Sequence, residues 1–306
     1  MKATLLFMTA ALYLASTPSS AWAQTPTPKL TCPPSGPAGG GRVSFCRMVE
    51  FSAPFIGSLG VSTGNGSESI QGWDSADVLI RAEIQTAALN VAEAEALALQ
   101  VSVDDVEGQV RATGPKSNRL QTWSVSYEIY LPRQADLTAT AGNGAISIED
   151  VQGHIRATTG NGSLSLARVG GEVNAVSGNG AISIQDSQGH LRFSSGNGSV
   201  SLVRLAGDVE GAAGNGSLAI TLGGDHWDGQ KLDVRTGMGV IEMNVPHDYS
   251  AHIEASTTFG AITTNFPATV EKTHGFGENV SFDDGAGGAL IRATTAFGSI
   301  RIQHLD

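Results

Sequence analysis

Apolar and polar residues alternate along the middle of the chain in a pattern that repeats every 18 residues. The tripeptide Gly-Asn-Gly begins at positions 142, 160, 178, 196 and 214, with no insertion or deletion between copies. Within each unit apolar residues recur at every second position, which is the period of a β-strand. Ile146 and Ile148 fall on one strand, and Ile155 falls on a second. A fixed period of this kind predicts stacked coils, each with two short strands and two turns.

The 18-residue register places equivalent residues of successive coils in columns. A serine column is expected to face outward, because it alternates with apolar positions along the strand. Three apolar columns are expected to fill the core between two parallel sheets: Ile146, Leu164, Ile182, Val200 and Leu218; Ile148, Leu166, Ile184, Leu202 and Ile220; and Ile155, Val173, Leu191 and Val209. The pattern therefore predicts an all-β fold, a parallel β-solenoid with 18-residue two-strand coils.

Glycine and asparagine stand together at one predicted corner of every coil. Glycine adopts positive φ freely, and asparagine tolerates the left-handed conformation better than most residues. The asparagine amides are also able to hydrogen-bond from coil to coil at the strand spacing of about 4.8 Å. We therefore expect a structural ladder of turn residues: Asn143, Asn161, Asn179, Asn197 and Asn215.

The sequence on either side of the regular repeat predicts two kinds of cap. Residues 42–135 are expected to form an N-terminal β-rich cap region with one short helix, which begins at Asn90 with a capping-box pattern. The solenoid is expected to cover residues 136–306, with irregular coils and a C-terminal cap from about residue 225. Terminal repeats depart from the pattern because they must cover open sheet edges.

The N-terminus has the pattern of a secretory signal peptide over residues 1–23. Lys2 precedes a short apolar run, and Ala21-Trp22-Ala23 matches a cleavage site. We therefore expect export to the periplasm, the cell surface or the extracellular space. Residues 24–41 are rich in Pro, Thr and Gly and are expected to be a linker. No later stretch is long and apolar enough to predict a transmembrane segment in the mature chain.

Two cysteines, Cys32 and Cys46, are present in the sequence. In an oxidising compartment two close cysteines are a natural pair. We predict a disulfide that ties the linker to the first strand.

Several segments, taken in order, resemble the bacterial DUF4097 family. Gln71-Gly72-Trp73-Asp74, followed by an apolar strand and an acidic Ala-rich helix, is similar to the N-terminal part of these proteins. Residues 125–132 are similar to the strand that introduces their repeats, and the Gly-Asn-Gly-x-Ile-x-Ile units with residues 256–264 and 294–302 are similar to the rest. The resemblance implies a bacterial β-solenoid of the adhesin type and supplies no catalytic residues.

One position departs from the family pattern. The residue after the second Gly of Gly-Asn-Gly is often Asp in the family, and here it is Ala or Ser: Ala145, Ser163, Ala181, Ser199 and Ser217. This substitution predicts a smoother and less charged face.

Composition and charge exclude several functions. The formal net charge is -11, with 18 basic and 29 acidic residues and no basic cluster, so we expect no nucleic-acid partner. Calcium-binding β-rolls need Asp where Ile146 and its equivalents stand, so the repeat lacks calcium ligands. Glycoside hydrolysis needs two suitably placed carboxylates, and no such pair recurs in the regular coils. We expect no metal ion and no cofactor.

A second outward column carries titratable groups. His154, Glu172, His190 and Asp208 follow one another coil by coil, with neighbouring side chains about 5 Å apart. Alternating imidazole and carboxylate groups are able to bind zinc or respond to pH. A solvated ladder of compatible charges accounts for the column equally well, and we favour that interpretation. Arg156, Asn174, Arg192 and Glu210 run beside it.

Three functions remain open at this stage. The leading hypothesis is an exported, non-enzymatic β-solenoid of the adhesin type, which presents repetitive Ser, Thr and Asn faces. Its partner would be an envelope or extracellular protein, a glycan, or another copy of the same chain. The alternative is a periplasmic structural or envelope scaffold without an external ligand. A polysaccharide-acting enzyme is the third hypothesis, because the irregular coils leave room for a site.

Overall fold

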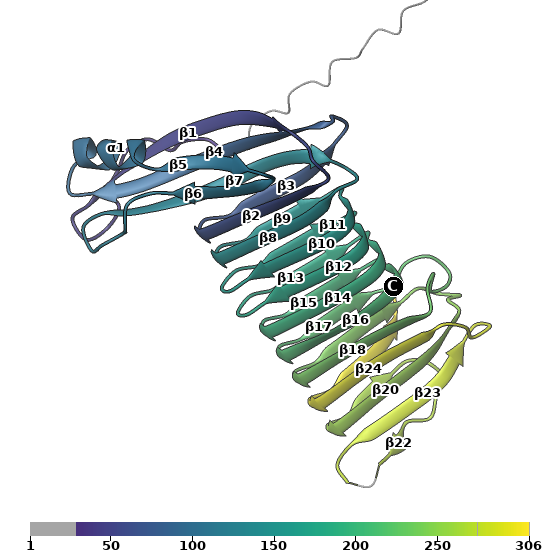
Figure 1. The fold of residues 1–306 in the computed structure, drawn as a ribbon. Coiled ribbons are helices and arrows are strands. Elements are labelled where there is room, and N and C mark those ends of the chain that lie inside the picture. Colours follow the sequence, from purple (N-terminus) through teal and green to yellow (C-terminus); the bar gives the residue numbers. More distant parts are fainter. Residues whose placement is uncertain (1–28, 274, 306) are drawn as a thin grey trace, which may run out of the picture.

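The protein is a β-solenoid of two facing sheets, with 12 and 13 strands, which we call sheet A and sheet B. The computed structural model describes residues 29–273 and 275–305, so the predicted signal peptide lies outside the described residues. Figure 1 shows the coils stacked along one axis, with a wider cap at the N-terminal end. The predicted all-β solenoid class with one short helix is confirmed.

The regular coils alternate strictly between the two sheets. Neighbouring strands pair in parallel and shift by 18 residues from coil to coil, as in Leu164↔Ile182 and Ile155↔Val173. Sheet A receives β9 (Ile146–Glu149), β11 (Leu164–Ala167), β13 (Ile182–Gln185), β15 (Val200–Val203) and β17 (Leu218–Thr221). Sheet B receives β8 (Asp136–Asn143), β10 (Gln152–Thr159), β12 (Gly170–Ser177), β14 (Gln188–Asn197) and β16 (Ala206–Asn215).

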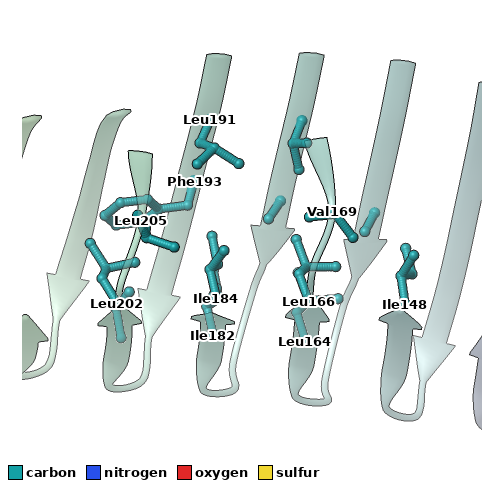
Figure 2. Close-up of a cluster of buried hydrophobic side chains, with 14 of the residues drawn as sticks. Ile148, Leu164, Leu166, Val169, Ile182, Ile184, Leu191, Phe193, Leu202 and Leu205 are labelled. Atoms are coloured by element: carbon teal, nitrogen blue, oxygen red, sulfur yellow. The ribbon is translucent and has the colours of Figure 1, made fainter. Parts of the chain in front are cut away.

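The predicted apolar columns form the core between the sheets. Figure 2 shows side chains from both sheets meeting there, among them Ile184, Leu191 and Leu202. Phe193 is the one aromatic residue of its column, and it fits because the next coil has Gly211 beside it. A Cβ atom on Gly211 would lie 2.3 Å from the Phe193 ring. The core is therefore filled by size-matched neighbours along the axis.

The N-terminal end of the stack contains a coil inside the region that the sequence assigns to the cap. β2 (Ser58–Asn65) and β3 (Glu68–Trp73) pair in parallel with β8 and β9. β6 (Gln109–Thr113) and β7 (Thr122–Pro132) then pair in parallel with β2 and β3 on their outer side. The stack therefore begins well before residue 136, and its first coil comes later in the sequence than its second.

Antiparallel strands complete the N-terminal cap. β1 (Val43–Pro54) pairs with β4 (Asp77–Ala88), which pairs with β7, and β5 (Ser102–Val106) pairs with β6. The helix α1 (Val91–Leu99) packs on β1 and β4. Its first turn is capped by Asn90, whose Oδ1 accepts from the Glu93 backbone N–H at 2.9 Å. No helix among the described residues is long and apolar enough to cross a membrane.

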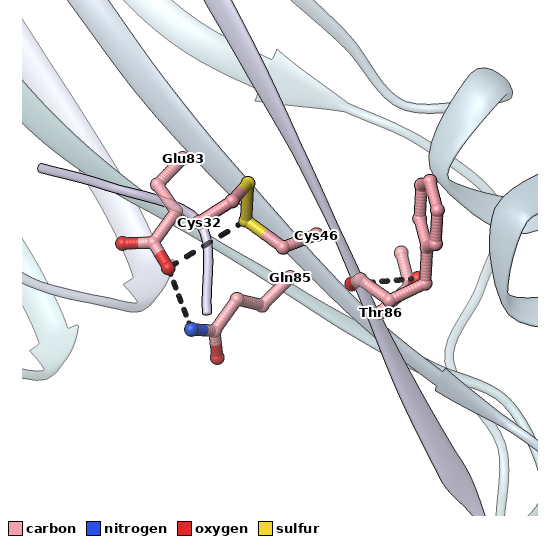
Figure 3. Close-up of a disulfide and its surroundings, with 6 residues drawn as sticks. Cys32, Cys46, Glu83, Gln85 and Thr86 are labelled. Carbon is pink, nitrogen blue, oxygen red and sulfur yellow. Dashed lines mark hydrogen bonds between the residues drawn. A yellow bond between two sulfur atoms is a disulfide. The ribbon is translucent and has the colours of Figure 1, made fainter. Parts of the chain in front are cut away.

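A disulfide joins Cys32 to Cys46 on β1, with a Cα–Cα distance of 5.4 Å. Figure 3 shows the bond beside Glu83 and Gln85, whose side chains are hydrogen-bonded to each other. The bond fixes the segment before β1 to the edge strand of sheet A. Closing a loop of this length typically stabilises a fold by about 3 kcal/mol.

The C-terminal end also departs from sequence order. β18 (Lys231–Met238) and β19 (Ile241–Val245) continue the stack, and β24 (Leu290–Phe297) and β25 (Ile300–His304) pair with them. β20 (Ala251–Phe259) and β21 (Ile262–Thr264) pair with the far side of β24 and β25. β23 (Glu278–Asp284) and β22 (Glu271–Lys272) close the edge of sheet B. Figure 1 shows β24 between β18 and β20, so the last coil in sequence is not the last in space.

Candidate binding face

The outer face of sheet B carries two polar columns that run along the solenoid axis. Strand register aligns the first, which we call the acid–His column: Asp136, His154, Glu172, His190 and Asp208. It aligns the second, which we call the Arg column: Thr138, Arg156, Asn174, Arg192 and Glu210. Both columns face solvent because the residues between them point into the core.

The acid–His column is a chain of ion pairs. His154 Nδ1 lies 3.0 Å from Asp136 Oδ1, and its Nε2 lies 3.6 Å from Glu172 Oε2. Hydrogen bonding to the Asp136 carboxylate raises the pKa of His154, and the His154 backbone N–H is the main cause that lowers the pKa of Asp136. His190 Nδ1 lies 3.5 Å from Asp208 Oδ2. The structure thus brings the predicted His–carboxylate column together as neighbouring pairs.

The column geometry does not suit a metal ion. Structural zinc sites need about four ligands around one point, whereas side chains in a straight column meet only their neighbours. Among the described residues no group of three or more His, Cys, Asp or Glu side chains could hold a metal ion. The column therefore offers alternating charge rather than a coordination cage.

A groove of about 620 Å³ crosses the N-terminal half of this face. Its long side chains come from the two columns, and Gln109 of β6 closes one end. The surface is hollow there because Gly60 and Thr138 are small, while Arg156 in the same column is long. The Gln109 amide lies over Gly60, where a Cβ atom would be only 2.2 Å from Gln109 Oε1.

The Arg column changes character along the groove. Arg192 Nε lies 3.8 Å from Glu210 Oε2, and Glu210 is also paired with Lys231. None of the ion pairs or side-chain hydrogen bonds found in residues 29–273 and 275–305 involves Arg156. Arg156 and Asn174 therefore present donors to the solvent at the centre of the groove.

The corner asparagines form the expected ladder of hydrogen bonds. Each Nδ2 donates to the Oδ1 of the preceding coil at 2.8–2.9 Å, from Asn215 back to Asn65. None of these asparagines has positive φ, so the expected left-handed corner is wrong. Glycine is needed there for space, since a Cβ on Gly162 would lie 2.0 Å from the Gly144 carbonyl oxygen. The ladder is structural and fully paired along its length.

The opposite corner holds a charged column that the sequence analysis did not predict. Asp150, Arg168, Asp186 and Arg204 all have φ between 49° and 60° and repeat every 18 residues. Arg168 Nε lies 2.7 Å from Asp150 Oδ1, and Arg204 Nε lies 2.7 Å from Asp186 Oδ1. These contacts lower the pKa values of both aspartates. The alternation of sign at the repeat period is the signal that would have revealed it.

The asparagine corner continues as an apolar row towards the C-terminal end. Register aligns Asn215 with Met238, then Phe297, Phe259 and Phe276. The Phe297 and Phe259 rings stack with centroids 5.0 Å apart, and all four side chains are exposed. We call this set the corner aromatic row. Its sequence signal is the loose copies of Gly-Asn-Gly in which Met or Phe replaces Asn.

One serine has the spacing of a nucleophile turn. Residues 60–64 read Gly-Val-Ser-Thr-Gly, with Ser62 at the centre. A nucleophile of this type sits on a sharp strand-to-helix turn. Ser62 instead lies within β2, in continuous register with Thr140 of β8. Its position is that of an ordinary outward strand residue.

The fold and this face define a class: a parallel β-solenoid whose described surface carries repeating polar columns. The chain belongs to the Toastrack DUF4097 family, whose model matches residues 69–303. The predicted family is confirmed. No curated protein matches the chain.

Solved structures with a similar fold have low identity to this chain. A putative adhesin from Bacteroides fragilis is 10% identical, with a TM-score of 0.37 over 85% of this chain and 97% of that one. A putative lipid binding protein from Parabacteroides distasonis is 11% identical, with a TM-score of 0.29 over 86% and 97%. A putative cell adhesion protein from Clostridium sporogenes is 10% identical, with a TM-score of 0.26 over 85% and 100%. At these values the likeness carries no argument about function.

Proposed function

We propose that this protein is an exported, non-enzymatic binding protein of the adhesin type. The outer face of sheet B would hold an envelope or extracellular partner, either a glycan or a protein. The observation that carries the proposal is the groove in which Arg156 and Asn174 stand open between two aligned columns. Export follows from the signal-peptide pattern of residues 1–23 in the sequence.

The arrangement of the groove carboxylates favours binding over hydrolysis. Asp136 and Glu172 stand in one column, and both contact the same His154 ring. Glycoside hydrolysis needs two carboxyl groups that flank the scissile bond. A ligand in this groove would meet both carboxylates on one side. The face therefore suits recognition by many weak polar contacts, whose combined strength grows with the number of coils engaged.

A binding screen with a matched surface control tests the proposal. The mature chain would be applied to arrays of glycans and envelope proteins, together with a double variant of the groove, His154→Ser with Arg156→Ser. The control is Ser165→Ala with Ser183→Ala, on the outer face of sheet A. We expect the parent and the control to retain a partner that the groove variant loses.

Cell fractionation completes the test. We expect the protein in the envelope or the medium and not in the cytoplasm. Equal retention by all three forms, or no retention at high concentration, would contradict the binding proposal. A protein that is found in the envelope and retains nothing would instead support the scaffold function.

A further inference from the structure

We propose that the groove on sheet B binds an acidic oligosaccharide, with the sugar chain lying along the solenoid axis. This inference rests on the proposed binding function and names its ligand class. Carboxylates of the sugar would lie on the Arg column, and its hydroxyl groups would lie on the acid–His column.

The Arg column supplies the donors for sugar carboxylates. Arg156 and Arg192 are two coils apart, with Asn174 between them, which gives a separation of about 10 Å at the strand spacing. A guanidinium group binds a carboxylate through two parallel hydrogen bonds, and Arg is the side chain best suited to this contact. Arg156 forms no ion pair among the described residues, so it would not have to break one on binding.

The acid–His column supplies acceptors for hydroxyl groups. Asp136 and Glu172 are ionised acceptors on the same side of the groove, and His154 lies between them. A sugar hydroxyl is able to donate to such a carboxylate while accepting from a neighbouring donor. One edge of the groove therefore fits hydroxyl groups and the other fits carboxylates, which is the chemistry of a uronic acid chain.

An acidic peptide fits the same groove less well. Side chains on one face of an extended peptide recur at about 6.6 Å, which does not match the Arg–Arg separation of about 10 Å. The peptide would also bring carboxylates against Asp136 and Glu172 without hydroxyl groups to satisfy them. These two mismatches favour the sugar chain.

The net charge of the protein does not oppose this binding at physiological salt. The formal charge is -11, but charges more than about 8 Å away are largely screened at 0.15 M ionic strength. Within the groove, Arg156, Arg192 and a histidine with a raised pKa oppose two carboxylates. The local balance is therefore neutral to positive where the ligand would lie.

Calorimetric titration with oligogalacturonate tests the proposal, with the methyl ester of the same oligomer as the ligand control. The ester keeps the hydroxyl groups and removes the carboxylate charge. We expect binding of the acid form and at least about tenfold weaker binding of the ester, because the charge-assisted hydrogen bonds are lost.

Protein variants locate the site. We expect Arg156→Gln to weaken binding about tenfold and Arg192→Gln to weaken it less, since Arg192 already shares Glu210. The control is Arg301→Gln, which removes the same charge from the exposed face of sheet A and is expected to leave affinity unchanged. Thermal unfolding of each variant checks that the fold is retained.

Each other outcome overturns a defined part of the proposal. Equal binding of acid and ester would exclude recognition of the carboxylate. Poly-L-glutamate that binds as tightly and competes would replace the sugar by an acidic peptide. No binding of any probe would exclude acidic sugars, while the array screen above would still decide whether the face binds something else.

Discussion

The corner column of the solenoid has two halves with opposite chemistry. From Asn65 to Asn215 each amide donates to the next, so the corner is polar and its groups are paired among themselves. From Met238 to Phe276 the same column is apolar, and Phe276 is 80% exposed. The first half satisfies its own side chains along the axis, whereas the second leaves apolar surface to solvent.

The core shows a similar contrast between the middle and the N-terminal end. In the regular coils the first inward column is Ile146, Leu164 and their equivalents. In the first coils the same column is occupied by Glu68 and Tyr127. Neither carboxyl oxygen of Glu68 nor the Tyr127 hydroxyl forms a well-shaped hydrogen bond within residues 29–273 and 275–305. The repeat thus stabilises itself where each coil has two equivalent neighbours and carries unpaired groups where it does not.

Replacing Glu68 should have the largest effect on this contrast. Burial raises the pKa of Glu68 to about 8, and the nearby Thr63 backbone only partly offsets it. The carboxyl is therefore protonated in the fold and ionised in the unfolded chain between about pH 4.5 and pH 8. Stability should fall as pH rises through this window, by roughly 4 kcal/mol in total. Glu68→Leu should remove this loss, as measured by urea unfolding at pH 5 and pH 9.

The control for that experiment is Glu172→Leu, which replaces an exposed carboxylate of the regular coils. It should leave the pH dependence of stability as in the parent. Parallel pH profiles for Glu68→Leu and the parent would show that the buried carboxyl carries no such cost.

A glycine pair probes the close contact between coils. A Cβ on Gly178 would lie 2.6 Å from the Gly160 carbonyl oxygen, whereas a Cβ on Gly64 at the equivalent place in the outer coil meets nothing within 4 Å. Gly178→Ala should therefore lower the free energy of unfolding by about 2 kcal/mol. Gly64→Ala should change it by less than about 0.5 kcal/mol. Equal shifts in the urea midpoint would mean that the corner does not depend on the neighbouring coil.

The smallest effects are expected at the corner side chains themselves. Asn179→Ala removes two ladder hydrogen bonds, each 2.9 Å, and should cost about 1 kcal/mol. Phe276→Ala should cost less than about 0.5 kcal/mol, since the ring is mostly exposed. Its effect should appear instead as earlier elution from a hydrophobic-interaction column. Leu99→Ala, at an exposed apolar residue outside the row, is the control and should shift elution less.

The sequence predicts the regular coils well because their order in space is their order along the chain. Leu164 pairs with Ile182 as the 18-residue register requires. The end coils escape prediction because any parallel edge with an alternating pattern accepts any similar strand. Nothing in Phe297-Gly298-Ser299-Ile300 says that it precedes Phe259-Gly260-Ala261-Ile262 in the stack. Glu68 was visible, since Gly64-Asn65-Gly66 places it where Ile146 stands in the first regular unit.

The two columns of the candidate face were likewise predictable, but the groove was not. His154 and Glu172 follow from the register alone. The hollow depends on Gly60 and on Gln109, which reach this face only because β2 and β6 join sheet B ahead of β8. Those pairings join segments about 50 residues apart in sequence, beyond the reach of the repeat.

The position of β24 and β25 has a consequence for biosynthesis. β20 and β21 leave the ribosome before β24 and β25, yet their permanent neighbours in the stack are these later strands. Until residue 304 has been translated, the growing rack ends at β18 and β19, and β20 to β23 wait without their final edge. Domains commonly fold while they are being made, starting from the N-terminus. This protein is expected to complete its far end in a single late step, when the last coil slides into the gap reserved for it.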